Sequence, residues 1–200
     1  MSTTTSAIIA NHLESLRSRI AEIRERARKQ FEHGAGGAQT ATTLSDGFRA
    51  FVVEQWLEAL SIVSPEVAEK LARRSALVAV GGTGRGELAP YSDIDLMFLY
   101  EPSVGDEFKQ VTNRCLHNLY DAKLELGRSV RTPSEAIAMA LDDSSIATSL
   151  LEMQSLWGSA DLVAKLKRKF ERTVVRRRRR AFFEAAIASA RSTAAPRLTG

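Results

Sequence analysis

Two aspartates, Asp93 and Asp95, stand two residues apart where the apolar run IDLMFLY (residues 94–100) begins. In a β-strand, residues two apart point to the same face, so both carboxylates would project together while Ile94 enters the core. Two carboxylates this close repel each other, and a divalent cation between them offsets that cost. A turn or cap role explains Asp93 but not Asp95, because a lone carboxylate inside an apolar strand is costly. The pair therefore predicts a site for a hard cation such as Mg²⁺.

A glycine-rich segment, GGTGRG (residues 81–86), precedes the aspartates. Its glycines allow backbone N–H groups to converge on an anion, and the guanidinium of Arg85 suits phosphate oxygens. A P-loop would require Lys and then Ser or Thr where this chain has Glu87 and Leu88. The dinucleotide fingerprint requires another glycine spacing, and Pro90 follows too early for a long helix. Glycines beside a carboxylate pair predict a turn that binds a nucleotide with its metal, where cations neutralise charge during phosphoryl transfer.

The composition is that of a folded globular domain: of 200 residues, 44% are hydrophobic and 26% are charged. The formal net charge is +4, but the run Arg176 to Arg180 contributes five positive charges, so a nucleic-acid partner is not indicated. Cys115 is the sole cysteine, which excludes an intramolecular disulfide and suits a reducing compartment. No signal peptide and no membrane-spanning stretch is recognisable, so we expect a cytoplasmic protein with no membrane partner.

Apolar periodicity and capping signals predict mostly helix around a few strands. We expect helices over residues 7–32, from Ser45 or Asp46 to 60, from Pro65, over 106–122, from Thr132 to Ala140, over 144–156 and over 161–190, then a frayed tail. Short apolar runs predict strands at 76–80 and 94–100. A third strand is expected over 124–126 and 129–131, interrupted at Gly127. This order predicts an α+β fold, in which helices pack on a small sheet.

The stretch GGTGRGELAPYSDIDL resembles the nucleotidyltransferase superfamily shared by DNA polymerase beta. More narrowly, it is similar to the N-terminal domain of bacterial protein-PII uridylyltransferase/uridylyl-removing enzymes, as is LYDAKLELGRSVRTPSEAIAMALDDSSIATSLLEMQSLWG. The likeness runs from Ala76 to Gly158 and weakly on through RRRRRAFFEA. It implies a small mixed β-sheet of the nucleotidyltransferase fold with packing helices at both ends. The implied divisions are a helical segment (1–75), the core (76–158), and a long basic helix with a tail (159–200).

The resemblance assigns roles to residues of this chain. The residues implied to bind the nucleotide are Gly81, Gly82, Gly84, Arg85 and Ser92, with Arg85 contacting phosphate and Ser92 ordering the loop. Asp93 and Asp95 match the catalytic pair that binds the metal. The superfamily uses a third acidic residue on a later strand, for which Glu125 is the best-placed candidate; the alternative for Glu125 is a solvent-facing residue at a strand end.

Three further positions follow from the same comparison. Glu87 is expected to brace the glycine turn, and Arg131 either reaches a nucleotide phosphate or pairs with a surface acid. Thr83 stands where the family usually has an aromatic residue, so we expect looser packing of the nucleotide or of the loop.

The implied activity is the transfer of UMP from UTP to a tyrosine of a PII-type signalling protein, with Mg²⁺ and release of pyrophosphate. Two alternatives stay open: another nucleotidyl transfer, such as adenylylation of a protein or small molecule, and nucleotide binding without turnover. The family enzymes are several times longer and add an HD-type phosphohydrolase and two ACT domains. None of the three histidines here is followed by aspartate, so we expect no such hydrolase site and interpret the chain as an N-terminal piece.

Overall fold

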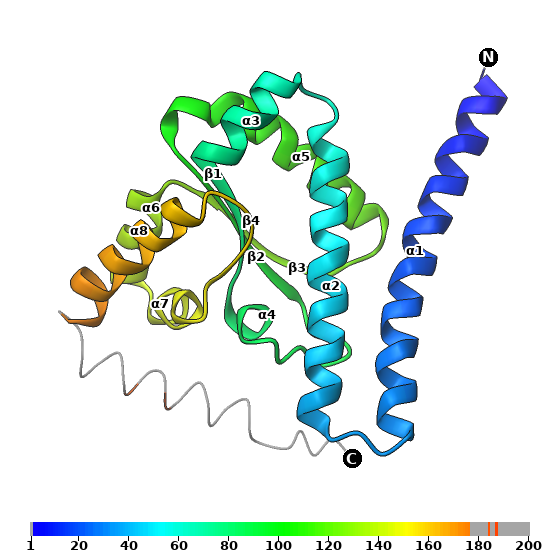
Figure 1. Cartoon of the computed structure of the whole chain (residues 1–200), viewed down its shortest axis with the longest axis horizontal. Coiled ribbons are helices and arrows are strands. Elements are labelled where there is room, and N and C mark those ends of the chain that lie inside the picture. The colour runs from blue at the N-terminus through cyan, green and yellow to red at the C-terminus, as the bar shows by residue number, and fades with distance from the viewer. Residues whose placement is uncertain (1, 177–183, 185–186, 188–200) are drawn as a thin grey trace.

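A four-stranded sheet with strand order β3-β2-β1-β4 forms the centre of the chain (Figure 1). β1 (Ser75–Ala79) pairs antiparallel with β2 (Ile94–Tyr100) and with β4 (Gln154–Gly158), and β2 pairs parallel with β3 (Leu126–Arg131). This computed structural model describes residues 2–176, 184 and 187. A mixed sheet packed between helices confirms the α+β fold class expected from the sequence.

Helices cover both faces of the sheet (Figure 1). They are α1 (Ser2–Glu32), α2 (Gly37–Leu60), α3 (Pro65–Arg74), α4 (Gly81–Arg85), α5 (Gly105–Asp121), α6 (Pro133–Asp142), α7 (Ser144–Leu151) and α8 (Ala160–Phe170). A short 3₁₀ turn, Pro102–Val104, leads into α5, and a π-helical turn, Glu171–Val175, continues α8. No helix in the described part of the chain is both long enough and apolar enough to cross a membrane.

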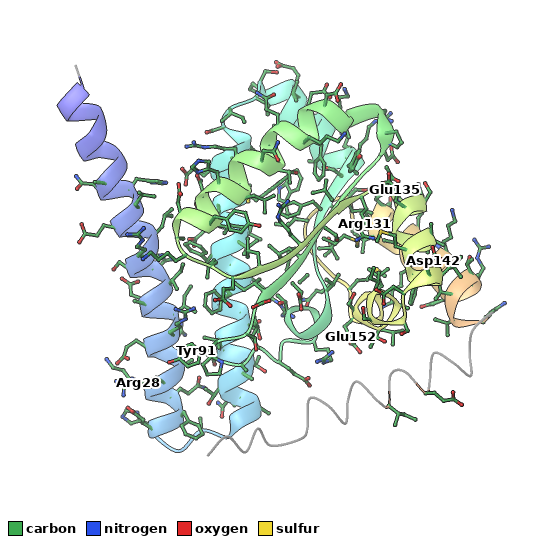
Figure 2. The ribbon with its side chains drawn as sticks, turned by 180° about the vertical axis from the view of Figure 1, so that it is seen from behind. Arg28, Tyr91, Arg131, Glu135, Asp142 and Glu152 are labelled. Atoms are coloured by element: carbon green, nitrogen blue, oxygen red, sulfur yellow. The ribbon has the colours of Figure 1, made fainter. Side chains whose placement is uncertain are left out.

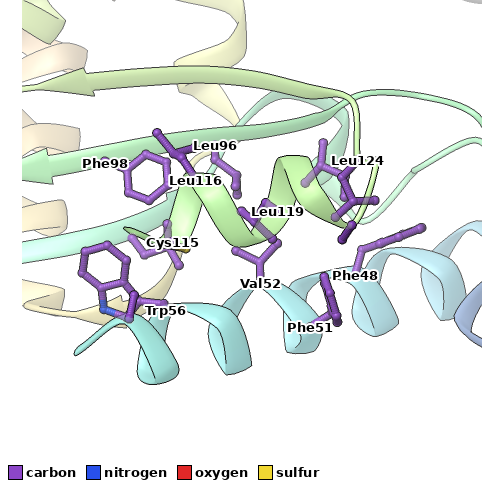
Figure 3. Packing of buried hydrophobic residues seen from close by; sticks show 14 of the residues in the cluster. Phe48, Phe51, Val52, Trp56, Leu96, Phe98, Cys115, Leu116, Leu119 and Leu124 are labelled. Carbon is purple, nitrogen blue, oxygen red and sulfur yellow. The ribbon is translucent and has the colours of Figure 1, made fainter. Parts of the chain in front are cut away.

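Alternation along β2 divides the core into two layers, as the period of a strand requires. Ile94, Leu96 and Phe98 join a cluster with α1, α2 and α5, whereas Met97 and Leu99 join a second cluster with α6, α7 and α8. Figure 3 shows the first layer, where α2 faces α5 beneath β2. Because one cluster extends from α1 to the residues before β3, the N-terminal helices share the core of the sheet. The divisions at residues 75 and 158 remain predictions.

Trp56 lies at the centre of the first layer and is fully buried. Its ring centroid is 5.8 Å from that of Phe98 on β2, 5.5 Å from that of Phe108 on α5, and 5.2 Å from that of Trp157 on β4. Such tilted aromatic pairs add to the free energy of burial. Trp56 therefore connects α2 to the sheet and to α5. Cys115 is buried in the same layer, which raises the pKa of its thiol to about 12 and makes it a packing residue.

Local capping signals place two helix starts where the sequence predicts them. Ser64 accepts a hydrogen bond from the backbone N–H of Val67, with Pro65 at the first helical position of α3. Thr132 and Glu135 form a reciprocal capping box at the start of α6, in which the Thr132 N–H donates to the Glu135 carboxylate at 2.7 Å. Both predictions are confirmed. They could be made from the sequence because each interaction lies within one helical turn.

Other boundaries differ from the sequence predictions. The predicted helix over 144–156 is wrong, since α7 ends at Leu151 and Gln154–Gly158 form the edge strand β4. β1 is buried along its whole length, and its backbone hydrogen bonds are completed by β2 on one side and β4 on the other. β3 begins at Leu126 and runs without interruption through Gly127. The tertiary partner of each strand decides these boundaries.

Two helices also have other limits than expected. α2 begins at Gly37, earlier than the predicted Ser45 or Asp46. α8 carries Leu162, Leu166 and Phe170 on a buried stripe as predicted, but it ends at Phe170 and passes into the π-helical turn. Residues 177–183, 185, 186 and 188–190 of the predicted basic helix, which include four of its five consecutive arginines, lie outside the described residues, as does the predicted tail.

We expect Trp56→Ala to lower the free energy of unfolding by about 3–5 kcal/mol, because it leaves a cavity shared by three elements. Urea denaturation of both proteins measures this difference. Leu57→Ala is the matched control: Leu57 follows on α2 but its side chain is 52% exposed, and we expect a change within about 0.5 kcal/mol. Equal losses in the two variants would contradict the central role of Trp56.

Candidate active site

The glycine-rich segment forms a short helix rather than the open turn that the sequence predicts. α4 spans Gly81–Arg85 directly after β1, and left-handed backbone at Gly81 (φ +54°) and Gly86 (φ +77°) begins and ends it. Gly84 allows close approach of another segment, because a Cβ atom there would lie 2.0 Å from the carbonyl oxygen of Glu152. Figure 2 shows Glu152 beside this helix. The glycines are therefore required by backbone conformation and contact as well as by any ligand.

Asp95 lies near the start of β2, half-buried between two glycines. A Cβ atom on Gly81 would lie 2.9 Å from Asp95 Oδ2, and one on Gly127 would lie 2.1 Å from Asp95 Oδ1. Gly127 is the register partner of Asp95 on the parallel strand β3, so both positions face the same side of the sheet. The bare backbone at these two positions makes the space that the carboxylate occupies.

The electrostatics of the aspartate pair fit a cation. Burial raises the pKa of Asp95, and the charge of Asp93 raises it further, while Arg85 opposes both effects. Within the described residues, no hydrogen bond or ion pair to the Asp95 carboxylate is present. A half-buried carboxylate beside a second one, without a counter-charge bonded to it, is a donor set of hard oxygens that suits Mg²⁺. Asp93 and Asp95 could therefore hold such a cation.

Three predicted residues are exposed and lie directly before strands β2 and β3. Ser92 and Asp93 are exposed in the loop before β2, and Glu125 is exposed just before β3. The N–H of Ile94 donates to the carbonyl oxygen of Glu125 at 3.0 Å, so Glu125 and Asp93 precede neighbouring parallel strands. Across the described residues, no three His, Cys, Asp or Glu side chains gather closely enough to hold a metal. The third carboxylate therefore remains a prediction.

The side chains of α4 are bonded within the protein. Thr83 is buried, and its Oγ1 accepts a hydrogen bond of 2.8 Å from the N–H of Asp95. Thr83 is therefore packed and bonded within the loop, where its small hydroxyl connects α4 to β2. Looser packing of the nucleotide or of the loop than an aromatic residue would give remains a prediction. Arg85 Nε donates to Glu87 Oε2 at 2.8 Å, so Glu87 braces the segment by holding this arginine.

Arg49 on α2 is a residue that the sequence interpretation missed. Only 13% of its side chain is exposed, and its guanidinium donates to the carbonyl oxygens of Thr83 and Gly84 at the end of α4. Ser45, one turn earlier on α2, accepts a hydrogen bond of 3.0 Å from the N–H of Leu88. The available signal was the position of Ser45 and Arg49 next to Phe48 and Val52 on the buried face of a predicted amphipathic helix.

A cavity of about 180 Å³ opens beside Asp95, between the β2–β3 face and helices α6 and α7. Its polar side chains include Ser129 and Arg131 of β3 and Ser149 of α7. Arg131 contacts the sulfur of Met139 and, among the described residues, forms no ion pair with a carboxylate. Figure 2 shows Arg131 and Glu135 where β3 leads into α6. Hydrogen bonds from Thr132 lower the pKa of Glu135, an exposed acid of α6, and the charge of Arg131 lowers it further. Pairing of Arg131 with a surface acid and its contact with phosphate therefore both remain predictions.

Comparison with known proteins agrees with this geometry. Residues 60–136 match the family model described as nucleotidyltransferase domain, a range that includes α4, both aspartates and β3. Three curated relatives are bifunctional uridylyltransferase/uridylyl-removing enzymes. The one from Azospirillum brasilense is 42% identical over 112 residues, covering 56% of this chain and 12% of the relative. The one from Phenylobacterium zucineum is 35% identical over 169 residues, covering 82% and 18%. The one from Ruegeria pomeroyi is 35% identical over 146 residues, covering 73% and 16%.

The fold, the paired carboxylates and the family match define a nucleotidyltransferase domain, of the class of enzymes that transfer nucleotidyl groups. Within this class, the chain belongs with the uridylyltransferase/uridylyl-removing enzymes, to which it is similar over most of its length. The chain spans only 12% to 18% of the length of these three relatives. The activity of the full-length relatives is therefore only a proposal for this chain.

We expect Gly127→Ala to lower nucleotidyl-transfer activity by about 100-fold, since the added methyl group displaces the Asp95 carboxylate from its place. The free energy of unfolding should change by no more than about 1 kcal/mol, because the clash is with the end of a side chain that can rotate. Activity assays and urea denaturation measure the two effects. Gly37→Ala is the control, since a Cβ atom there would meet nothing within 4 Å; equal activity of the two variants would contradict the packing role of Gly127.

We expect Asp95→Asn to abolish activity and yet to raise the melting temperature at pH 7 by a few degrees. Because the pKa of Asp95 is raised in the folded protein, its ionisation favours the unfolded chain. The gain from asparagine should grow as pH rises from the ordinary pKa of aspartate to the raised value, and then stay constant. Melting curves between pH 4 and pH 8 measure it, and a gain that is the same at every pH would contradict the raised pKa.

Proposed function

We propose that the chain transfers UMP from UTP to a tyrosine hydroxyl of a PII-type signalling protein and releases pyrophosphate, with Mg²⁺ as cofactor. The observation that carries this proposal is the Asp95 carboxylate, packed between the backbones of Gly81 and Gly127 and beside the charge of Asp93. The name uridylyltransferase of the relatives supports UTP as the nucleotide. The cytoplasmic location expected from the sequence belongs to the same proposal.

In this proposal, Asp93 and Asp95 hold Mg²⁺, and Glu125 is the third carboxylate. Bound Mg²⁺ supplies Lewis-acid stabilisation of the charge on the phosphate oxygens. For this role Asp95 must be ionised, and its raised pKa places the loss of its proton at a higher pH than in an exposed aspartate. Removal of the charge of Asp93 should therefore lower the pKa of Asp95.

The protein groups then orient the reacting phosphate. The backbone of Gly81, Gly82 and Gly84 and the side chains of Arg85 and Ser92 are proposed to bind the triphosphate. Arg85 starts from its ion pair with Glu87, 2.8 Å away, so binding of phosphate exchanges one anionic partner for another. The tyrosine oxygen forms a bond to the α-phosphorus and its hydroxyl proton is released to solvent. The bond between the α-phosphorus and the oxygen that bridges it to the β-phosphorus breaks, and pyrophosphate leaves with that oxygen and the electron pair. Charge stabilisation on these oxygens lowers the barrier.

The groups assigned to this site would contact the triphosphate and its metal. Both of these features are common to all nucleoside triphosphates. Choice of base and acceptor therefore rests on the relatives alone, and transfer of AMP is the alternative outcome to be tested. Incorporation of labelled UMP or AMP from the two triphosphates, with and without a PII-type protein, separates the outcomes. Preference for ATP would contradict the uridylyl assignment, and nucleotide binding without any transfer would contradict catalysis by this chain.

We expect Asp93→Asn to lower UMP incorporation by about 100-fold or more, because a metal ligand contributes several kcal/mol to the stabilisation of the transition state. The measurement is labelled UMP transferred per minute at saturating Mg²⁺ and UTP. Asp142→Asn makes the same chemical change at an exposed aspartate at the end of α6 and should leave the rate unchanged. Unaltered transfer in Asp93→Asn would remove Asp93 from the catalytic site.

A further inference from the structure

The guanidinium of Arg49 closes the carboxyl end of α4. Its Nε donates to the carbonyl oxygen of Thr83 at 2.9 Å, and its Nη2 donates to that of Thr83 and, at 2.7 Å, to that of Gly84. The last carbonyl groups of a helix have no partner within the helix and carry partial negative charge. A planar cation with several donors satisfies two of them at once, which the single ammonium group of lysine does less well.

Thr83 connects Arg49 to β2, the strand that carries Asp95. Its carbonyl group is bonded to Arg49, while its hydroxyl group accepts the N–H of Asp95 at 2.8 Å. On the other side of the same residue, the carbonyl oxygen of Asp95 accepts the N–H of Val80 at 3.1 Å. The backbone N–H of Asp95 is therefore fixed by the residue that Arg49 holds, and its carbonyl oxygen by Val80, the residue directly before α4.

A second contact from α2 fixes the far end of this segment. Ser45 lies one helical turn before Arg49 and binds the N–H of Leu88, and Gly86 passes close to the guanidinium, where a Cβ atom would lie 3.6 Å from Nη2. Ser45 and Leu88 are both buried. The chain from Thr83 to Leu88 is thus held at both ends by one face of α2, which is itself fixed by the core around Trp56.

We propose that Arg49 is a positioning residue for nucleotidyl transfer, which acts through Thr83 to hold the Asp95 carboxylate and the glycine backbone of α4 in place. The role rests on the proposed function of Asp95 as a metal ligand. A displacement of a reacting group by about 1 Å reduces rates strongly, so a residue remote from the substrate can control activity through such a contact. The side chain of Arg49 itself is occupied by the two carbonyl groups and by Asp46, whose Oδ1 lies 3.3 Å from Nη1.

The first test needs neither metal nor nucleotide. Hydrogen exchange of the Asp95 amide is followed by NMR in the full chain and in Arg49→Met, Arg49→Lys and Arg19→Met. Arg19 is an exposed arginine of α1 paired with Glu22 and Glu54, and serves as the matched control. We expect the Asp95 amide to exchange roughly ten-fold faster or more in Arg49→Met, less so in Arg49→Lys, and at the original rate in Arg19→Met. An unchanged exchange rate in Arg49→Met overturns the proposal.

The second test separates positioning from loss of folded protein. A purely structural role would lower kcat in proportion to the folded fraction and leave the Mg²⁺ concentration for half-maximal activity unchanged. We expect Arg49→Met to raise that concentration roughly ten-fold and to lower kcat by about 100-fold, with Arg49→Lys in between. If the half-maximal Mg²⁺ concentration does not move while the Asp95 amide is exposed, Arg49 orders the loop without serving the metal ligand, and the proposal fails.

Thr83→Val tests the same connection from its other end, and Arg49→Lys replaces Arg49→Met in these tests if Arg49→Met does not fold. It removes the hydroxyl group that binds Asp95 and leaves the carbonyl group that binds Arg49. We expect the double variant Arg49→Met/Thr83→Val to lose little more than the stronger single variant, because both changes break one connection. Independent, multiplicative losses contradict it. If the unchanged protein transfers no nucleotide at all, the proposed function fails, while the exchange rate of the Asp95 amide still decides whether Arg49 positions Asp95.

Discussion

The structure depends on keeping a half-buried carboxylate next to another of the same charge. Burial and the charge of Asp93 disfavour the ionised form of Asp95 and so raise its pKa. The protein provides no bonded counter-charge for it within the described residues, and instead fixes its backbone and clears space for its side chain. In the proposed function, this loss of stability at one residue keeps two hard oxygen ligands together for a nucleotide and its cation.

The sheet and helix α2 together fix the position of Asp95. β2 is held by β1 and β3 on its two edges and is buried on both faces, so its direction and register are firmly set. α2 packs on one face through Trp56, contacts α4 through Arg49, and binds Leu88, beyond α4, through Ser45. The same helix therefore stabilises the core and orders the glycine-rich segment, which relates the packing of the fold directly to the geometry of the site.

Features encoded within a few residues could be predicted from the sequence. The limits of β2 follow from a bounded apolar run, and the starts of α3 and α6 follow from Ser64-Pro65 and from the Thr132 capping box. The edge strand β4 could not be predicted, because its helix-like apolar pattern is overridden by the open hydrogen-bonding edge of β1, far away in the sequence. Gly127 suggested an interruption of the strand, whereas its role is to leave room for the side chain of its register partner.

By itself, the sequence determined the α+β class, the pairing of Asp93 with Asp95 and the family resemblance, because strand period, capping and a contiguous motif are local properties. Only the tertiary structure decided that GGTGRG forms a helix, that Thr83 binds the Asp95 amide, and that Arg49 closes that helix. Arg49 and Thr83 are 34 residues apart in the chain. The largely buried guanidinium of Arg49 finds its partners only when the packing of α2 on the sheet brings them within hydrogen-bonding distance.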